Sequence, residues 1–217
     1  MASRFGPYVS LTGLVLYIDP YNVKSYPGSG ITAYNLIDNQ TSTLSSVTYG
    51  STSFVNAGTG LIAGGTSYNL NLAAGYTVIQ FMNLTSRQGG YFNYIAGSNS
   101  INLYSGGLTT MRWETYASGG DLYSSSTIPL NTWHSWAGTF SGTASAGGSG
   151  TSSLYLNGIL DNTATINGTN TNNATFQLGY QGGAMNGLLG PTLFWNRALS
   201  ASEVRAVHVA LKGRYGI

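Results

Sequence analysis

The sequence is poor in cysteine and in charge. None of its 217 residues is a cysteine, which excludes disulfides, thiolate metal sites and a cysteine nucleophile together. Charged residues make up 6% of the chain, against about 25% in ordinary globular proteins. The net charge is +2 and the basic residues are scattered singly, so no basic stripe exists for nucleic acid or for an anionic membrane. We therefore expect neither nucleic acid nor a membrane as a partner.

Long apolar segments are missing as well. The longest aliphatic or aromatic run is Leu14 to Ile18, which is far too short to cross a bilayer. The N-terminal residues Met1 to Pro7 lack the apolar stretch of a secretion signal. The sequence therefore predicts a protein without membrane insertion and without a secretion signal.

Glycine and small polar residues take the place of charge and separate many short strand-like runs. Glycine alone accounts for 31 residues. Asn157-Gly158 is the strongest hairpin signal, because both positions of a type I′ turn need a positive φ. A chain of this length suits one all-β domain. Apolar or alternating runs predict strands at 14–18, 67–72, 76–82, 91–96, 100–104, 108–113, 121–124, 132–140, 152–157, 159–161, 175–178 and 188–195.

A single helix is expected, at the C-terminal end of the chain. Ser200 is followed three residues later by Glu203, the spacing of a capping box in which each side chain bonds the other residue's backbone amide. Val204, Val207, His208 and Leu211 then recur at helical spacing and form one apolar stripe. Gly213 is placed to end the helix. The pattern predicts a short helix that packs on a sheet.

Four motifs spread along the chain resemble one family of domains. They are S-Y-P-G-S-G at 25–30, the Trp-to-Phe strand at 133–140, L-Y-L-N-G-I at 154–159 and N-R-A-L-S at 196–200. The sequence resembles the laminin-G-like, concanavalin A-like jelly-roll domains found in structural proteins of tailed phages. The resemblance implies an all-β fold, a two-sheet jelly-roll sandwich with one short C-terminal helix. Residues 1–10 are expected to form an N-terminal arm and residues 11–217 the domain.

Catalysis is not expected. Glycosidases need two carboxyl groups facing one substrate, whereas Glu114 and Asp121 flank a glycine-containing loop and do not alternate along one strand. His208 falls on the apolar stripe of the helix, and His134 lies beside a tryptophan in a predicted strand. No G-x-S-x-G motif is present. The sequence therefore predicts a protein that is not an enzyme.

Calcium is the ion that the resemblance implies, but the sequence departs from the family at this point. Relatives commonly carry an acidic residue where this chain has Gly190, and calcium prefers carboxylate ligands. We therefore expect no cofactor. Asp161, Asp121 or asparagine side chains remain as alternative ligands for an ion elsewhere.

Aromatic side chains near loops are the candidate contacts with a ligand or a partner. These are Trp113, Tyr116, Tyr123 and Tyr180. The alternative is that such rings fill the core or an assembly interface, where tyrosine is enriched.

The sequence and the resemblance together favour a structural protein of a tailed-phage virion. We expect a capsid decoration, or cement, protein or another exposed component, assembled in the host cytoplasm. Its partners would be other virion proteins of the capsid or tail, or further copies of the chain. The alternative is a carbohydrate-binding adhesin, such as a receptor-binding tail-fibre or lectin-like module, with a surface glycan as ligand.

Overall fold

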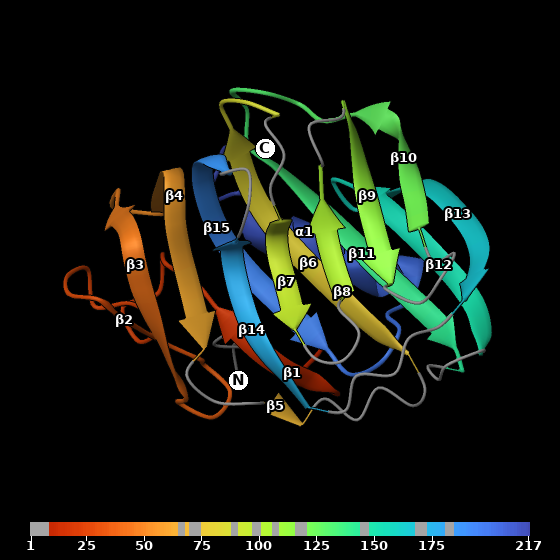
Figure 1. Ribbon diagram of the computed structural model, residues 1–217, viewed down its shortest axis with the longest axis horizontal. Coiled ribbons are helices and arrows are strands. Elements are labelled where there is room, and N and C mark those ends of the chain that lie inside the picture. Colours follow the sequence, from red (N-terminus) through yellow and green to blue (C-terminus); the bar gives the residue numbers. More distant parts are fainter. Residues whose placement is uncertain are drawn as a thin grey trace.

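The computed structural model describes residues 9–64, 68–69, 75–87, 91–96, 101–105, 109–115, 121–143, 148–167, 173–180 and 185–217. Within them the chain is mostly β-strand, with a helix at the C-terminal end (Figure 1). The elements are β1 (Leu14–Ile18), β2 (Thr32–Tyr34), β3 (Thr41–Tyr49), β4 (Phe54–Gly64), β5 (Tyr68–Asn69), β6 (Tyr76–Leu84), β7 (Tyr91–Ala96), β8 (Ile101–Tyr104), β9 (Thr110–Thr115), β10 (Asp121–Thr127), β11 (His134–Gly142), β12 (Ser149–Leu156), β13 (Ile159–Asn167), β14 (Asn173–Tyr180), β15 (Asn186–Trp195) and α1 (Ala201–Lys212).

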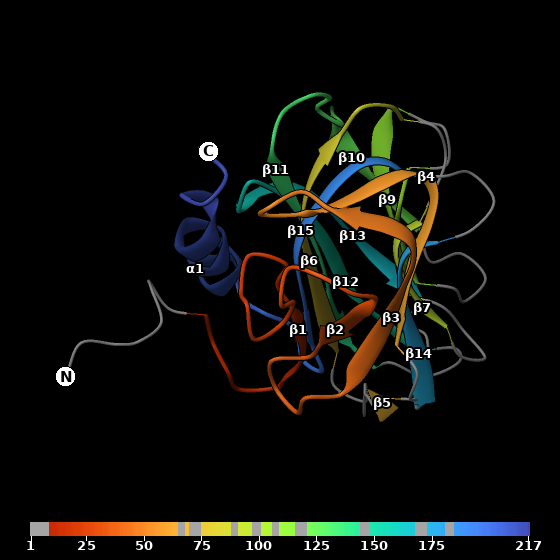
Figure 2. The same cartoon turned by 90° about the vertical axis from the view of Figure 1, so that its left-hand side faces the viewer.

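The strands form two layers that face each other, with α1 outside one of them (Figure 2). The front sheet runs in the order β10-β9-β8-β7-β14-β4, followed by β3 and β2. The back sheet runs β15-β6-β11-β12-β13, with β1 beside β15. Strand β4 joins the two, because its first half pairs with β15 and its second half with β14. This arrangement confirms the predicted two-sheet sandwich.

The core between the sheets is rich in aromatic rings. Tyr76 stacks on Phe140 with ring centroids 5.2 Å apart and also contacts Trp113 at 5.8 Å. The Trp113 ring lies against the backbone of β11 at Gly138, where a Cβ atom would come within 2.3 Å of the ring. Glycine is therefore required at position 138 by close packing between the sheets.

A second core lies between the back sheet and α1. Side chains of β6 alternate between the two cores: Val78 and Met82 face the front sheet, whereas Ile79 and Phe81 face the helix. The helix side is completed by the predicted stripe of Val204, Val207, His208 and Leu211, which is buried. Because β6 is covered on both faces, its sequence is almost continuously apolar.

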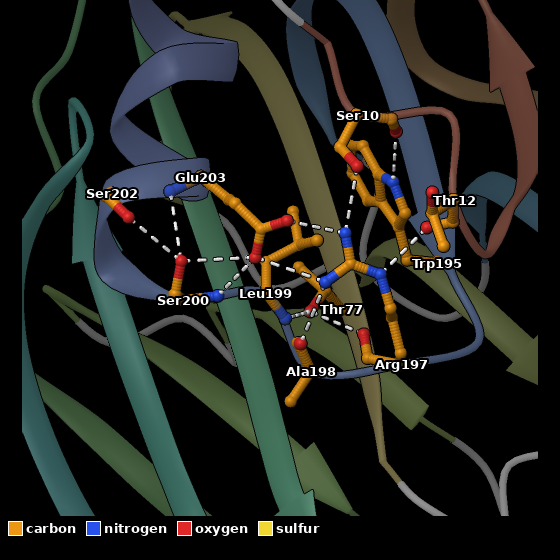
Figure 3. Close-up of polar contacts among 10 residues, drawn as sticks. All are labelled: Ser10, Thr12, Thr77, Trp195, Arg197, Ala198, Leu199, Ser200, Ser202 and Glu203. Carbon is orange, nitrogen blue, oxygen red and sulfur yellow. Dashed lines mark hydrogen bonds and ion pairs between the residues drawn. The ribbon is translucent and has the colours of Figure 1, made fainter.

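The start of α1 and the preceding loop are held by one arginine (Figure 3). Ser200 and Glu203 form the predicted capping box. Arg197 donates to Glu203 Oε1 at 2.6 Å and to the Thr12 carbonyl at 2.8 Å. It also reaches the Ser10 hydroxyl at 2.9 Å, next to the bond from Trp195 Nε1 to the Ser10 carbonyl. The last residue of the predicted arm is thus bound to the domain, while residues 1–8 lie outside the described part.

Most predicted strands are found, with ends shifted by a few residues, and the Asn157-Gly158 turn joins β12 to β13 with positive φ at both residues. The strand predicted at 67–72 lies mostly outside the described residues, which retain only β5 there. Strands β2, β3 and β4 were not predicted. Their Ser-, Thr- and Gly-rich sequences have little apolar alternation, and β3 gains its order from its long pairing with β4.

None of the helices in the described residues is long and apolar enough to cross a membrane.

Candidate functional site

The outer face of the front sheet carries a compact group of polar and aromatic side chains at β8, β9 and β10. Inward-facing residues of these strands, such as Leu103, Trp113 and Leu122, belong to the core between the sheets. Alternation along each strand places the intervening residues on the opposite face. We call these residues the front-face cluster; they are Asn102, Tyr104, Arg112, Glu114, Asp121 and Tyr123.

Strand register arranges the cluster in two rows. In one row, Asn102 and Asp121 lie on either side of Glu114. In the other, Tyr104 and Tyr123 lie on either side of Arg112. Directly opposed residues of antiparallel strands have side chains within contact distance. The register alone therefore sets one arginine between two tyrosines and next to two carboxylates.

Arg112 links the two carboxylates. Its Nη2 donates to Asp121 Oδ2 at 2.6 Å and to Glu114 Oε1 at 3.2 Å. Asn102 Nδ2 donates to the other oxygen of Glu114 at 3.0 Å. Glu114 is only 5% exposed, and a buried carboxylate is tolerated when it is paired and hydrogen-bonded in this way.

The charge on Arg112 is stabilised by its partners. Burial acts to lower the pKa of Arg112, but the hydrogen bond that Arg112 donates to Asp121 and the negative charges of Glu114 and Asp121 outweigh it and raise the pKa above its usual value. An arginine side chain is protonated at ordinary pH in any case, and these partners favour its charged form further. It serves as a fixed donor at the centre of the cluster.

The two tyrosines flank this guanidinium. Arg112 Cζ lies 5.7 Å from the ring centroid of Tyr104 and 5.8 Å from that of Tyr123, within the range of cation–π attraction. Tyr123 is 42% exposed, so part of its ring is open to solvent. The site combines exposed aromatic surface, a fixed donor and carboxylate acceptors.

The other acidic residues are used to hold the fold together. Asp19 is fully buried and pairs with Arg214, and Glu203 caps α1. Asp38 accepts hydrogen bonds from Asn35 and Gln40 within one turn. Of the 6 acidic residues in the chain, only Glu114 and Asp121 therefore lie together on the outer side of the front sheet, where Asp121 is the more exposed of the two.

Asp161 has a structural role at the edge of the sandwich. Its carboxylate, on the last strand of the back sheet, accepts from the backbone amides of Ser125 at 2.7 Å and Ser126 at 3.1 Å on β10. Neighbouring Asn162 donates to the Tyr123 carbonyl at 2.8 Å. These bonds join the front sheet to the back sheet and fix β10, which carries Tyr123 of the cluster.

Among the described residues no group of three His, Asp or Glu side chains could hold a metal ion.

Both histidines pack inside the protein. His208 Nδ1 lies 2.9 Å from the Ser135 hydroxyl beneath the helix, and burial lowers its pKa to about 4. His134 Nδ1 lies 2.9 Å from the Thr132 carbonyl, and burial likewise lowers its pKa to about 4. Both side chains are at least nine-tenths buried, so a hydrolytic Ser–His pair on the surface does not arise from Ser135 and His208.

The aromatic residues predicted as contacts lie in different places. Tyr123 lies in the front-face cluster. Trp113 does not contact solvent at all, so its prediction as a surface contact is wrong: neighbouring residues of β9 point to opposite faces, and Trp113 points to the core. Tyr180 ends β14, but its side chain lies outside the described residues, as does Tyr116.

Sequence reasoning missed Arg112, Tyr104 and Asn102, and it set aside Glu114 and Asp121 because they flank a loop. The structure pairs Glu114 directly with Asp121 across the β9–β10 hairpin. Alternation with the apolar residues of each strand could have marked these positions as outward-facing. The register that joins them could not be read from one sequence.

A two-sheet antiparallel sandwich with β4 shared between the sheets and a helix closing the back defines a concanavalin A-like jelly roll. Residues 47–205 match the laminin G-like family model of the concanavalin A-like lectin/glucanases superfamily. The chain belongs to this superfamily, as its motifs predicted. A comparison with curated proteins finds no match.

Solved structures with the same fold include parts of carbohydrate-active proteins and of a toxin. Trypanosoma rangeli sialidase is 14% identical with a TM-score of 0.69, covering 97% of this chain and 36% of the sialidase. Domain 4 of AbnA, a GH43 extracellular arabinanase of Geobacillus stearothermophilus solved with arabinotriose, is 20% identical with a TM-score of 0.57, covering 90% and 98%. The binding domain of botulinum neurotoxin DC, solved with rat synaptotagmin II, is 11% identical with a TM-score of 0.65, covering 92% and 52%. The chain thus spans about a third of the sialidase, and at these identities the likeness shows the fold.

Proposed function

We propose that this chain is a carbohydrate-binding protein without catalytic activity, which binds a glycan at the front-face cluster. The observation that carries the proposal is the row in which Tyr104 and Tyr123 flank Arg112 at 5.7 and 5.8 Å, with Asp121 bonded to the same guanidinium. Membership of a lectin/glucanase superfamily and the arabinotriose-bound arabinanase domain support it.

The chemistry of the cluster suits a sugar. A pyranose or furanose ring has an apolar C–H face, which packs on an exposed aromatic ring such as Tyr123. Its hydroxyl groups donate to the free oxygen of Asp121 and accept from the guanidinium of Arg112, and hydrogen bonds to charged groups are the stronger kind. Ligand sites commonly combine aromatic surface with a few placed polar groups in this way.

The same geometry favours binding over hydrolysis. A retaining glycosidase uses one free carboxylate as nucleophile and one protonated carboxyl group as acid, about 5–5.5 Å apart. In the cluster, Glu114 and Asp121 both accept hydrogen bonds from Nη2 of Arg112. Because one guanidinium holds both carboxyl groups, neither stands free to act on a substrate as nucleophile or as acid.

The test is glycan-array screening of the whole chain, followed by calorimetry of the best ligand with the wild type and Tyr123→Ala. We expect Tyr123→Ala to weaken binding at least tenfold. Tyr34→Ala removes another exposed tyrosine, on β2 at the far edge of the front sheet, and should bind like the wild type. Equal losses in both variants, or release of reducing sugar during incubation, would contradict the proposal.

We also propose, as a second candidate function, that the protein is displayed on a tailed-phage particle as a capsid decoration or other exposed virion component. The resemblance of its motifs and a chain in which only 6% of the residues are charged support this. The two roles are compatible, since a particle protein can bind host glycans.

The test of the second candidate is quantitative mass spectrometry of purified particles from the source. Hundreds of copies per particle would indicate capsid decoration, and a few to a few dozen copies would indicate a tail or fibre component. A complete absence from particles would refute the virion assignment and leave the carbohydrate-binding proposal standing.

A further inference from the structure

The charges of the front-face cluster do not balance. Glu114 and Asp121 contribute two negative charges, and Arg112 contributes one positive charge. The other described cations are bonded or lie elsewhere. Arg87 donates to the Ile128 carbonyl, and Arg197 and Arg214 pair with acids near the two ends of the chain. Arg205 and Lys212 lie on α1, and Lys24 lies between β1 and β2. Counted over the part of the chain that the structure describes, the cluster therefore has a net charge of about −1, with Arg112 as its cation.

This imbalance decides which sugars fit. An acidic sugar, such as a uronic or sialic acid, needs a cation for its own carboxylate, yet Arg112 already serves two carboxylates of the protein. The carboxylate of an acidic sugar would come close to Asp121, and the two negative charges would repel each other. Repulsion between like charges is a common way in which polar interfaces reject wrong partners. A neutral sugar offers hydroxyl donors to Asp121 and meets no such repulsion.

The spacing of the two tyrosines decides how long the ligand is. Tyr123 on β10 and Tyr104 on β8 are separated by β9, and two strand spacings amount to about 10 Å. A single sugar ring that packs on Tyr123 does not extend to Tyr104. A ligand that contacts both rings therefore has more than one sugar unit and lies across the strands.

We propose that the front-face cluster binds a neutral oligosaccharide that lies across β10, β9 and β8, and that it discriminates against acidic glycans. The proposal rests on the proposed carbohydrate-binding function and narrows it to one class of ligand. Tyr123 and Tyr104 pack on separated sugar units, and Asp121 and Arg112 bind the hydroxyl groups between them.

The experiment compares neutral oligosaccharides of one to four units with uronic-acid and sialylated oligosaccharides of the same lengths, by array and then by calorimetry. We expect affinity for the neutral series to rise at least tenfold from one unit to three. We expect acidic glycans of equal length to bind at least tenfold more weakly. A preference for acidic glycans would overturn this inference while leaving carbohydrate binding intact, whereas no binding in either series would overturn the proposed function as well.

A pair of charge variants distinguishes an effect of charge within the cluster from an effect of the net charge of the whole protein. Asp121→Asn removes one negative charge within the cluster and the ion pair of that residue with Arg112, so the ratio of neutral to acidic affinity should fall about tenfold. Asp38→Asn makes the same change of net charge in a remote turn and should leave the ratio at its wild-type value. An unchanged ratio in Asp121→Asn would contradict the inference, as would an equal fall in both variants.

Discussion

The two outer faces of the sandwich differ in what covers them. On the back sheet, Ile79, Phe81 and Trp195 point outward but are covered by α1 and form a second apolar core. On the front sheet, the face above β8, β9 and β10 carries Tyr123 and Arg112, which remain partly exposed. Figure 2 shows the helix on one side of the molecule and the front sheet on the other.

This difference separates stability from binding. Burial of apolar side chains is the main favourable term in folding, so the face beneath the helix stabilises the sandwich. The front-face cluster adds little apolar burial, but its exposed members Tyr123, Asp121 and Arg112 present groups that can contact a ligand. We therefore expect substitutions beneath the helix to alter the free energy of unfolding, and substitutions on the front face to alter glycan binding.

The largest effect is expected for Leu211→Ala beneath the helix. Leu211 is 2% exposed and contacts the back-sheet core, so truncation should lower the free energy of unfolding by about 2–5 kcal/mol, measured by urea unfolding. Val209→Ala on the same helix is the control, because Val209 is 43% exposed and should change stability by less than about 0.5 kcal/mol. Similar losses in the two variants would mean that α1 does not cover the sheet as described.

The stability of the protein should also depend on pH, through a histidine on the helix side of the back sheet. Burial, with smaller contributions from Lys212 and Arg205, lowers the pKa of His208 to about 4 from 6.5. The unfolded chain therefore binds more protons between these values, so the stability from a neutral His208 is present above pH 6.5 and is lost as the pH falls toward 4.

Thermal unfolding between pH 7 and pH 4 checks this expectation. The melting temperature of the wild type should fall across this range, and that of His208→Gln should fall less, with buried His134 accounting for part of the remaining slope. Tyr123→Ala on the front face should keep the wild-type slope. If the wild type and His208→Gln lose stability in parallel, His208 is not the titrating group.

A smaller effect is expected at the start of the helix. Ser200 accepts from the Glu203 amide in the capping box, so Ser200→Ala should cost about 1 kcal/mol of stability, measured by denaturant unfolding. Ser202→Ala removes a hydroxyl 3.0 Å from that of Ser200 but no bond to the helix backbone, so it should cost less than Ser200→Ala. A neutral Ser200→Ala would show that Arg197 alone holds the helix start.

The smallest effect on stability is expected on the front face. Tyr123→Ala removes one exposed cation–π contact with Arg112, so the free energy of unfolding should fall by about 0.5 kcal/mol. The same variant is expected to lose glycan binding. Binding would then depend on the front face and stability on the face beneath the helix. A loss as large as that of Leu211→Ala would show that Tyr123 is a structural residue.

Much of the fold could be predicted from local patterns. The Ser200–Glu203 spacing located the helix start, the apolar stripe located its buried face, and Asn157-Gly158 located the β12–β13 hairpin. These features depend on residues close together in the sequence. Strands β3 and β4 were missed because their order comes from pairing across the sheet and not from a local apolar pattern.

The candidate site could be predicted only in part, since Tyr123 was found as a possible contact by reasoning from loop position and Asp121 was considered only as an ion ligand. The sequence by itself determined the all-β class, the superfamily and the near absence of charge. The tertiary structure decided that Trp113 faces the core while Arg112 faces outward, and that Glu114 meets Asp121 across a hairpin. The physical reason is that register between strands depends on the packing of the whole sheet, and a shift of one residue would send each of these side chains to the other face.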